Sequence, residues 1–243
     1  MMNSFEEFQT VCQEQLDLEL SDDQINMFHV YYDLLIEWNQ KMNLTAITEL
    51  PDVLMKHFYD SVSLCKFYGE IRTETLSVID VGTGAGFPGI PLKIAFPNLK
   101  ITLLDSLQKR VGFLNEVINS LGLTEIEAVH GRAEVFGRDQ KYRDQYDLCV
   151  SRAVANFATL SELCLPFLRM GGCFISYKSE KAAEELQVAD KALFLLKGKV
   201  ERVKEFTLPD TDMNRTFVVV KKTAPTPKPY PRKAGTPAKS PLS

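Results

Sequence analysis

The sequence V-I-D-V-G-T-G-A-G-F-P-G-I-P occupies residues 78–91. A β-branched run passes through Asp80 to Val81, and four glycines follow within eight residues. Glycine lets a backbone turn sharply and approach a neighbour closely, because no Cβ stands in the way. Pro88 suits the first turn of a helix, whose free N–H groups hold anionic groups. The stretch therefore predicts a strand, a loop that approaches a ligand or a neighbouring strand, and then a helix.

Short apolar runs alternate with amphipathic stretches around this loop. We expect strands over Leu76–Val81, Lys100–Leu104, Ile126–His130, Tyr146–Ser151 and Gly172–Tyr177, and helices over Gly89–Phe96, Gln108–Leu121, Phe157–Leu168 and Lys181–Lys197. This alternation predicts right-handed crossovers and a parallel sheet covered on both faces. Two last strands, Val200–Leu208 and Arg215–Lys222, predict a C-terminal antiparallel hairpin. The expected fold class is α/β, with a mostly parallel seven-stranded sheet.

The chain divides into three expected parts: a helical cap over residues 1–70, the α/β domain over 71–223, and a basic, proline-rich arm over 224–243. The arm is too rich in proline for regular structure and is expected to be extended. The cap is expected to hold three helices. Possible capping pairs are Ser4 with Glu7 and Ser21 with Gln24, the second helix runs to about Lys41, and the third begins at Pro51 and ends at Gly69.

The composition is that of a soluble globular protein. Of the 243 residues, 45% are hydrophobic and 25% are charged, and no apolar run approaches the length of ~18–20 residues that a membrane span needs. The stretch Met1–Thr10 carries acids and no basic residue, which is unlike a signal peptide. Five cysteines without a C-x-x-C pair and three dispersed histidines predict reduced thiols and no metal site. We expect a cytoplasmic monomer.

Charge is distributed unevenly along the chain. The net charge is −4, yet residues 221–243 carry six basic side chains and no acid, while the other 220 residues hold 22 basic and 32 acidic side chains. A basic tail on an acidic body favours a contact with a polyanion, and a solvated terminus is the equally weighted alternative.

The glycine loop fits two cofactor patterns. Gly84-x-Gly86-x-x-Gly89 matches the dinucleotide motif, whereas Gly82-x-Gly84-x-Gly86 after Asp80 matches methyltransferases that use S-adenosylmethionine. Three features favour the methyl donor: the acid before the loop, the terminal hairpin, and Asp105 at the end of the second strand, where a carboxylate can accept both ribose hydroxyls. The structural alternatives are that Asp80 caps the turn and Asp105 caps the next helix.

Longer stretches of the sequence indicate one particular family of methyltransferases. They are E-W-N-Q-K-M-N-L-T (37–45), K-H-F-Y-D-S-V (56–62), D-V-G-T-G-A-G-F-P-G-I-P-L (80–92), L-D-S-L-Q-K-R-V-G-F-L (104–114), H-G-R-A-E (130–134), S-R-A-V-A (151–155) and Y-P-R-K-A-G-T-P (230–237). Together they closely resemble the ribosomal small-subunit methyltransferase G (RsmG/GidB) family, from the second helix to the tail. One departure is Ala234, where the family pattern leads us to expect proline.

The resemblance implies a Rossmann-like class I methyltransferase fold that transfers a methyl group from S-adenosylmethionine to N7 of a guanine in a loop of bacterial 16S rRNA in the small ribosomal subunit. It implies that Gly82 and Phe87 contact the cofactor, that Ala133 and Glu134 lie beside its adenine, and that Arg152 lies near the reaction centre. The cofactor-binding candidates are Asp80, Gly82, Gly84, Phe87, Asp105, Ala133, Glu134 and Arg152.

The chemistry agrees with the resemblance. Guanine N7 carries a free lone pair, so no general base is required, and the catalytic task is positioning and the exclusion of water. Enzymes that methylate exocyclic amines often carry a D/N-P-P-Y-type motif at the end of the fourth strand. The string S-R-A-V stands there in this chain, which argues against methylation of an amine. For Arg152 we favour a contact to a phosphate or to the cofactor carboxylate, since a cation beside N7 would oppose the transition state. The alternative is a structural pair with Glu134.

RNA contacts are expected from basic side chains and an unstacked target base. The candidates are Lys109, Arg110, Arg132, Arg138, Arg232 and Lys233. A solvated helix face is the alternative for the first two. In the cap we favour structure over catalysis, with Trp38 packing the cap and with His57 and Asp60 as a local helix pair. The competing functions are a small-molecule methyltransferase, a nicotinamide oxidoreductase and a non-catalytic RNA-binding protein.

Overall fold

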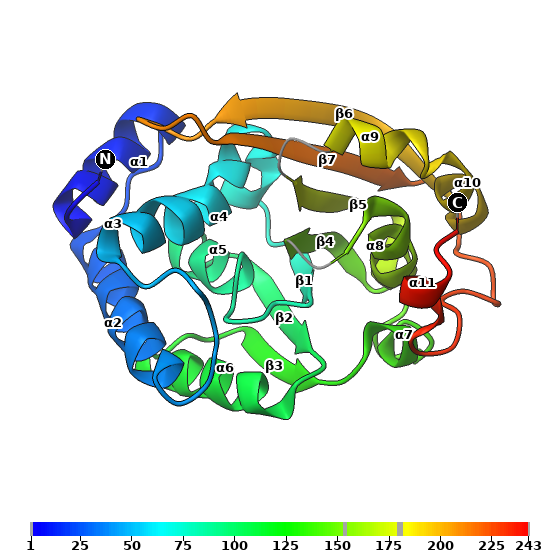
Figure 1. The fold of residues 1–243 in the computed structure, drawn as a ribbon, viewed down its shortest axis with the longest axis horizontal. Coiled ribbons are helices and arrows are strands. Elements are labelled where there is room, and N and C mark those ends of the chain that lie inside the picture. Colours follow the sequence, from blue (N-terminus) through cyan, green and yellow to red (C-terminus); the bar gives the residue numbers. More distant parts are fainter. Residues whose placement is uncertain (1, 153–154, 179–181, 243) are drawn as a thin grey trace.

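The computed structural model describes residues 2–152, 155–178 and 182–242. A seven-stranded sheet runs through the middle of the molecule (Figure 1). Its strands are β1 (Ser77–Val81), β2 (Lys100–Asp105), β3 (Ile126–His130), β4 (Tyr146–Arg152), β5 (Leu168–Lys178), β6 (Gly198–Thr207) and β7 (Asn214–Lys222). The order is β3-β2-β1-β4-β5-β7-β6. Neighbouring strands pair in parallel from β3 to β5, and β7 pairs antiparallel with both β5 and β6. The expected fold class is confirmed.

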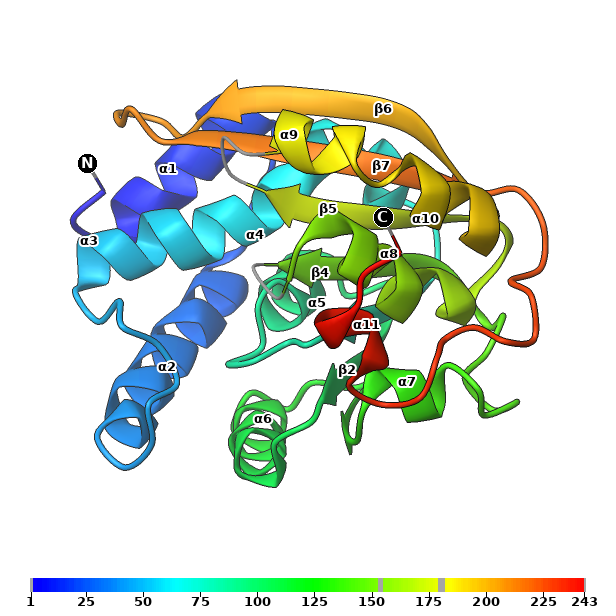
Figure 2. The same ribbon diagram turned by 45° about the vertical axis from the view of Figure 1, so that its right-hand side comes forward.

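Helices cover both faces of the sheet. They are α1 (Phe5–Leu16), α2 (Asp22–Asn39), α3 (Leu50–Val53), α4 (Asp60–Val62), α5 (Gly89–Ala95), α6 (Gln108–Ser120), α7 (Ala133–Phe136), α8 (Phe157–Cys164), α9 (Ala182–Gln187), α10 (Asp190–Leu196) and α11 (Thr236–Lys239). The cap helices gather with α5 and α6 on one side, and α7 to α11 lie on the other (Figures 1 and 2). Successive strand residues alternate between these sides: Val78 belongs to the core under the cap and Ile79 to the core under α8.

Local sequence signals set several boundaries. The side chain of Ser21 accepts from Gln24 N while Gln24 reaches back to Ser21 N, a complete capping box. Ser4 likewise accepts from Glu7 N, but the Glu7 carboxylate accepts from Asn3 N instead of Ser4 N. The first cap is therefore only half of the expected pair.

Two expected helices are wrong in extent. The segment Phe157–Leu168 is helical only to Cys164. A 3₁₀ turn, η4 (Leu165–Phe167), follows, because Pro166 has no N–H to continue the helix. In place of one helix over Lys181–Lys197 there are two, α9 and α10, which meet at a turn around the fully buried Ala189. Lys181 itself lies outside the described residues. No glycine or proline lies at this turn, so the sequence pattern predicts one continuous helix across it.

The third cap helix is not a plain α-helix. It begins with α3, continues as a π-helix, η1 (Leu54–Tyr59), returns to α4, and ends in a 3₁₀ turn, η2 (Ser63–Lys66). Gly69 does not end it, but begins a separate 3₁₀ turn, η3 (Gly69–Arg72). π-Segments are rare and occur frequently at functional sites. The sequence spacing of Leu54, Phe58 and Val62 predicts the buried face but not this change of register.

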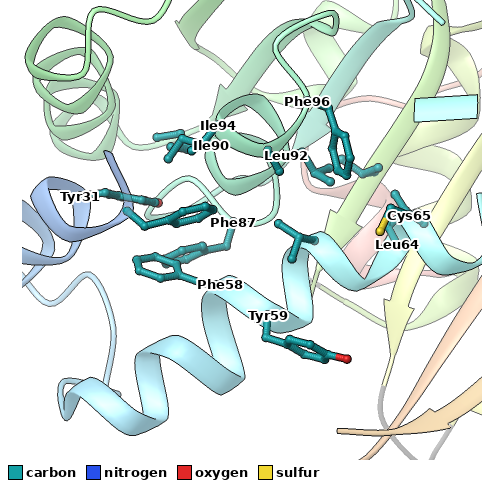
Figure 3. Close-up of a cluster of buried hydrophobic side chains, with 14 of the residues drawn as sticks. Tyr31, Phe58, Tyr59, Leu64, Cys65, Phe87, Ile90, Leu92, Ile94 and Phe96 are labelled. Carbon is teal, nitrogen blue, oxygen red and sulfur yellow. The ribbon is translucent and has the colours of Figure 1, made fainter. Parts of the chain in front are cut away.

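An aromatic cluster joins the cap to the glycine loop, defined here as residues 82–88. The ring of Phe87 lies 5.4 Å from Tyr31 and 6.1 Å from Phe58, centroid to centroid (Figure 3). All three side chains are buried, and the Tyr31 hydroxyl donates to the backbone oxygen of Ala85. The cap therefore fixes the position of the loop directly.

We predict that Gly86→Ala destabilises the fold far more than Gly122→Ala. Both glycines have a positive φ, which costs an L-residue about 1–2 kcal/mol. A Cβ at Gly86 would also lie 2.6 Å from Ile90 Cδ1 and 2.7 Å from Tyr31 Oη, whereas nothing lies within 4 Å at Gly122. Overpacking adds about 1–3 kcal/mol at Gly86 only. Urea unfolding of both variants measures the difference, and equal losses would contradict this packing.

Candidate functional site

Two cavities lie at the carboxyl edge of the sheet. The first, here the loop cavity, has a volume of about 230 Å³ and is lined by Val81, Gly82, Leu104, Ser106, Gly131, Arg132, Ala133, Glu134 and Leu163. The second, here the polar cavity, has about 590 Å³ and is lined by Ile47, Lys56, His57, Asp60, Arg152, Ala155, Tyr177, Lys178, Glu185 and Arg215. The loop cavity follows β1, β2 and β3, and the polar cavity follows β4 and β5. They therefore flank the β1–β4 boundary, where the strand order reverses and ligands bind in open α/β sheets.

Asp80 holds the glycine loop from inside. Its Oδ2 accepts from the Thr83 hydroxyl at 2.7 Å and from Gly89 N at 2.9 Å. Oδ1 has no hydrogen-bond partner among the described residues. Burial raises the pKa of this carboxyl to about 7, although the two hydrogen bonds favour the ionised form. Asp80 thus caps the turn, as the structural alternative expects.

Asp105 connects the same loop to the next helix. Its Oδ2 accepts from Gly84 N and its Oδ1 from Leu107 N, both at 2.9 Å, and Arg110 Nη1 lies 3.5 Å from Oδ2. The residue is 2% exposed. Asp105 therefore bonds the residue before α6, and the alternative that it caps this helix is wrong, because α6 has no side-chain cap. A carboxylate offers about four lone-pair sites, so Asp105 keeps the capacity to accept further hydrogen bonds.

Arg152 is fixed at the end of β4, in the lining of the polar cavity. Its Nη1 donates to the Lys56 backbone oxygen and to Asp60 Oδ2, both at 3.0 Å, and its Nη2 donates to His57 Nδ1 at 3.2 Å. The guanidinium carbon lies 5.0 Å from the centroid of the Phe87 ring, a cation–π distance. The alternative pairing with Glu134 is wrong, since Glu134 accepts from Gly235 N at 2.7 Å.

His57 is neutral and held in one tautomer. Its ring stacks on Phe87 with centroids 4.5 Å apart, and burial, followed by the charge of Arg152, lowers its pKa to about 3. An arginine can only donate, so Nδ1 is the acceptor and the ring proton is on Nε2. That proton is donated to Thr45 Oγ1 at 2.9 Å. A continuous chain of hydrogen bonds therefore runs from Thr45 through His57 to Arg152.

Two cap residues contribute more to the site than the sequence predicts. The expected local helix pair of His57 and Asp60 is incomplete, because both bind Arg152, and Asp60 Oδ1 also accepts from Arg215 Nε at 3.0 Å. The available signal was the string K-H-F-Y-D, which places Lys56 and His57 in the π-helical segment and Asp60 at the start of α4. Trp38 packs its ring 5.7 Å from that of Phe113 on α6, as expected for a cap residue.

The RNA-binding candidates differ in whether their side chains are exposed or already bonded within the protein. Lys109, Arg132 and Lys233 are exposed, and Arg132 also lines the loop cavity. Arg110 lies beside Asp105. Arg138 donates to the backbone oxygens of Pro229 and Pro231, and Arg232 donates to Glu162.

The C-terminal segment, residues 224–242, packs on the domain. The carboxylate of Glu162 is fully buried and accepts from Arg232 Nε at 2.9 Å and Nη2 at 2.6 Å. Thr159 Oγ1 donates to the Pro237 backbone oxygen, and Gly235 N donates to Glu134 of the loop cavity. The expectation of a segment without regular structure is wrong at α11, where Pro237 occupies the first turn of a helix.

Comparisons with known proteins agree with this architecture. A family model described as GidB, rRNA small subunit methyltransferase G, matches residues 24–214. A Ribosomal RNA small subunit methyltransferase G from Lachnoclostridium phytofermentans is 56% identical over 227 residues, which is 93% of each chain. One from Clostridium novyi is 47% identical and covers 99% of this chain and 100% of its own. A solved SAM dependent methyltransferase from Aquifex aeolicus superposes with a TM-score of 0.53 at 19% identity, over 76% of this chain and 98% of its own.

The sheet order, the terminal hairpin and the glycine loop place the chain in the fold class of the Aquifex aeolicus methyltransferase. Within that class, the chain belongs to the rRNA small subunit methyltransferase G family. The resemblance drawn from the sequence strings is confirmed. Among the residues that the structure describes, no group of three His, Cys, Asp or Glu side chains could hold a metal ion, and no helix is long and apolar enough to cross a membrane.

We predict that Arg232→Met costs about 3–5 kcal/mol of stability, because it leaves the buried carboxylate of Glu162 without its cation. The neighbouring Lys233→Met is the matched control. It removes the same charge from an exposed site and should change stability by less than about 0.5 kcal/mol. Urea unfolding of both variants measures the difference. Equal stabilities would show that the segment does not depend on this ion pair.

We predict that His57 makes the fold acid-sensitive. The pKa of His57 in the folded protein is about 3, below the ordinary 6.5. As the pH falls from 6.5 towards 3, His57 is therefore protonated in the unfolded chain but stays neutral in the native protein. Stability should fall in that window, by at most about 1.4 kcal/mol per pH unit. His57→Gln keeps an acceptor and a donor without this titration. Unfolding free energies of both proteins at pH 7, 6 and 5 should diverge, and parallel curves would contradict the prediction.

Proposed function

We propose that this chain transfers a methyl group from S-adenosylmethionine to N7 of a guanine in a loop of 16S rRNA, on the small ribosomal subunit. The observation that carries the proposal is the pair of cavities that flank the β1–β4 boundary, where the Arg152 guanidinium lies over the Phe87 ring. A cofactor in the loop cavity and a base in the polar cavity would meet at this junction. The nearly full-length similarity to rRNA methyltransferases supports an RNA substrate.

The loop cavity suits the cofactor. Gly82 and Gly84 turn the backbone with positive φ, and nothing lies within 4 Å of the place where a Cβ on Gly84 would be. Asp105, beside the loop, has acceptor capacity for ribose hydroxyls, while Ala133 and Glu134 form the wall expected beside the adenine. Asp80 acts from inside the loop, and we place the methyl end of the cofactor beside Phe87 and Arg152, which contact each other.

The sulfonium of S-adenosylmethionine, when bound, supplies an electrophilic methyl group. The residues of this chain have to bind, orient and keep out water, because N7 of guanine needs no deprotonation before it attacks. His57, whose pKa is about 3, is neutral at physiological pH and adds no positive charge beside the base. Alignment of the two reactants can contribute on the order of 7–11 kcal/mol.

The RNA surface is proposed from exposed basic side chains. Arg132 lines the loop cavity, and Lys109 stands exposed on α6. Lys233 is exposed two residues before Gly235, whose N–H donates to Glu134 of the loop cavity. Loss of each such phosphate contact should weaken RNA binding and reduce its salt dependence.

The test compares two glycines with the same strain. Gly84→Ala and Gly171→Ala both place a Cβ on a positive φ in open space. Only the first should obstruct the cofactor, so we expect it to weaken binding of S-adenosylhomocysteine about tenfold or more by calorimetry, a loss of about 1.4 kcal/mol. Gly171→Ala should bind within about twofold of the parent.

The reaction itself is tested with labelled S-adenosylmethionine and small subunits from cells that lack this enzyme. Digestion and mass spectrometry should identify 7-methylguanosine at one loop site. Cofactor binding without transfer to subunits or to free 16S rRNA would overturn the RNA substrate. Transfer to a metabolite in its place would establish a small-molecule methyltransferase.

A further inference from the structure

The polar cavity presents hydrogen-bond donors. The hydrogen bonds of Arg152 use both N–H groups of Nη1 and one of Nη2, so among the described residues its Nε–H and one Nη2–H remain. Arg215 uses Nε on Asp60 and Nη1 once on the Asn214 backbone oxygen, and three of its five N–H groups remain. A ligand that fits these two side chains presents acceptors.

The acids of the cavity are already engaged. Both oxygens of Asp60 accept from arginines, and Oε2 of Glu185 accepts from Lys178 Nζ and Phe157 N. The lining holds four basic side chains against these two carboxylates, whereas the whole chain has a net charge of −4. The local excess of positive charge also suits a ligand rich in acceptors.

Arg152 cannot reorient freely. Its guanidinium is bonded to the Lys56 backbone oxygen, to Asp60 and to His57, and it stacks over Phe87. Only 13% of its side chain is exposed. Donors fixed in this way can discriminate, because a wrong ligand leaves them unpaired and they cannot turn to water.

We infer that Arg152 selects guanine by donating to O6 of the target base, and that Asp60 is the positioning residue that orients Arg152 and compensates its charge. This inference rests on the proposed function. The edge of guanine that carries N7 presents two acceptors, N7 and O6, whereas adenine presents N7 and the N6 amino donors. Adenine would bring donors against the donors of Arg152, while guanine would satisfy one and leave N7 free to react.

Asp60 reduces an electrostatic conflict in this arrangement, although its other oxygen is bonded to Arg215. In the reaction the N7 lone pair forms the new bond to the methyl carbon, the methyl–sulfur bond breaks with its electron pair staying on sulfur, and no proton moves. The positive charge passes to the base, so an unpaired guanidinium beside it would oppose the reaction. Asp60 Oδ2 lies 3.0 Å from Arg152 Nη1 and supplies the opposing negative charge.

The experiment removes the O6 atom from the target base and leaves Arg152 unchanged. Small subunits are reconstituted with guanosine, inosine or 2-aminopurine riboside at the target position, and single-turnover methylation is measured. Inosine keeps O6 and N7 and should react within about threefold of guanosine. 2-Aminopurine lacks O6 and should react about 10–100-fold more slowly, the range of one good base contact. Because the protein is unaltered, misfolding cannot produce this result.

Variants assign the contact to Arg152. In Arg152→Met the ratio of the guanosine to the 2-aminopurine rate should fall to the ratio that the intrinsic N7 reactivities of the two bases set. Any intrinsic difference in N7 reactivity persists in that variant and so can be separated. Asp60→Asn should lower the single-turnover rate about tenfold or more and leave S-adenosylhomocysteine binding within about twofold. Asp52→Asn, which removes a half-exposed carboxylate paired with Lys56, is the matched control and should leave both unchanged.

The outcomes separate the two claims. If guanosine subunits accept no methyl group, the proposed function fails and the inference fails with it. If guanosine reacts and 2-aminopurine reacts within threefold of it, the inference alone is overturned. The inference is also overturned if the ratio survives in a folded Arg152→Met protein, or if Asp60→Asn and Asp52→Asn behave alike.

Discussion

The contact of Phe87 with His57 and Arg152 is the constraint on which the rest of the site depends. Phe87 belongs to the glycine loop, His57 to the cap and Arg152 to the end of β4, so three distant parts of the chain meet at one ring. Because His57 also accepts from Arg152, the ring and the guanidinium are fixed together. The cap is thereby part of the site and not only a cover for the sheet.

This junction also organises charge. An arginine at the β1–β4 boundary would make that region strongly positive, yet Asp60 is shared between Arg152 and Arg215 and His57 is kept neutral by burial. The buried Asp80 and the nearby Asp105 instead serve the backbone of the glycine loop. Asp80 and Asp105 thus hold the glycine loop, while Asp60 binds the two arginines. The hydrogen-bond donors that surround each buried carboxylate determine this difference.

The fold was predictable from local pattern, whereas the site was predictable only in part. The β1 strand, its glycine loop and the Ser21 cap follow from short-range rules of periodicity and capping. The π-helical turn that carries His57 follows from no spacing rule, and the pair of Arg232 with Glu162 joins residues 70 positions apart. Contacts of that range arise from the folded topology, so the packing of the C-terminal segment and the partners of Arg152 needed the structure.

The most direct test of the account is a crystal structure of the protein with S-adenosylhomocysteine and guanosine 5′-monophosphate. We predict the first molecule in the loop cavity, with its ribose at Asp105. We predict the guanine in the polar cavity, with O6 at Arg152 and N7 towards the sulfur. A guanine bound away from His57, Arg152 and Arg215, with the loop cavity filled, would contradict the claim that the two cavities form one active site.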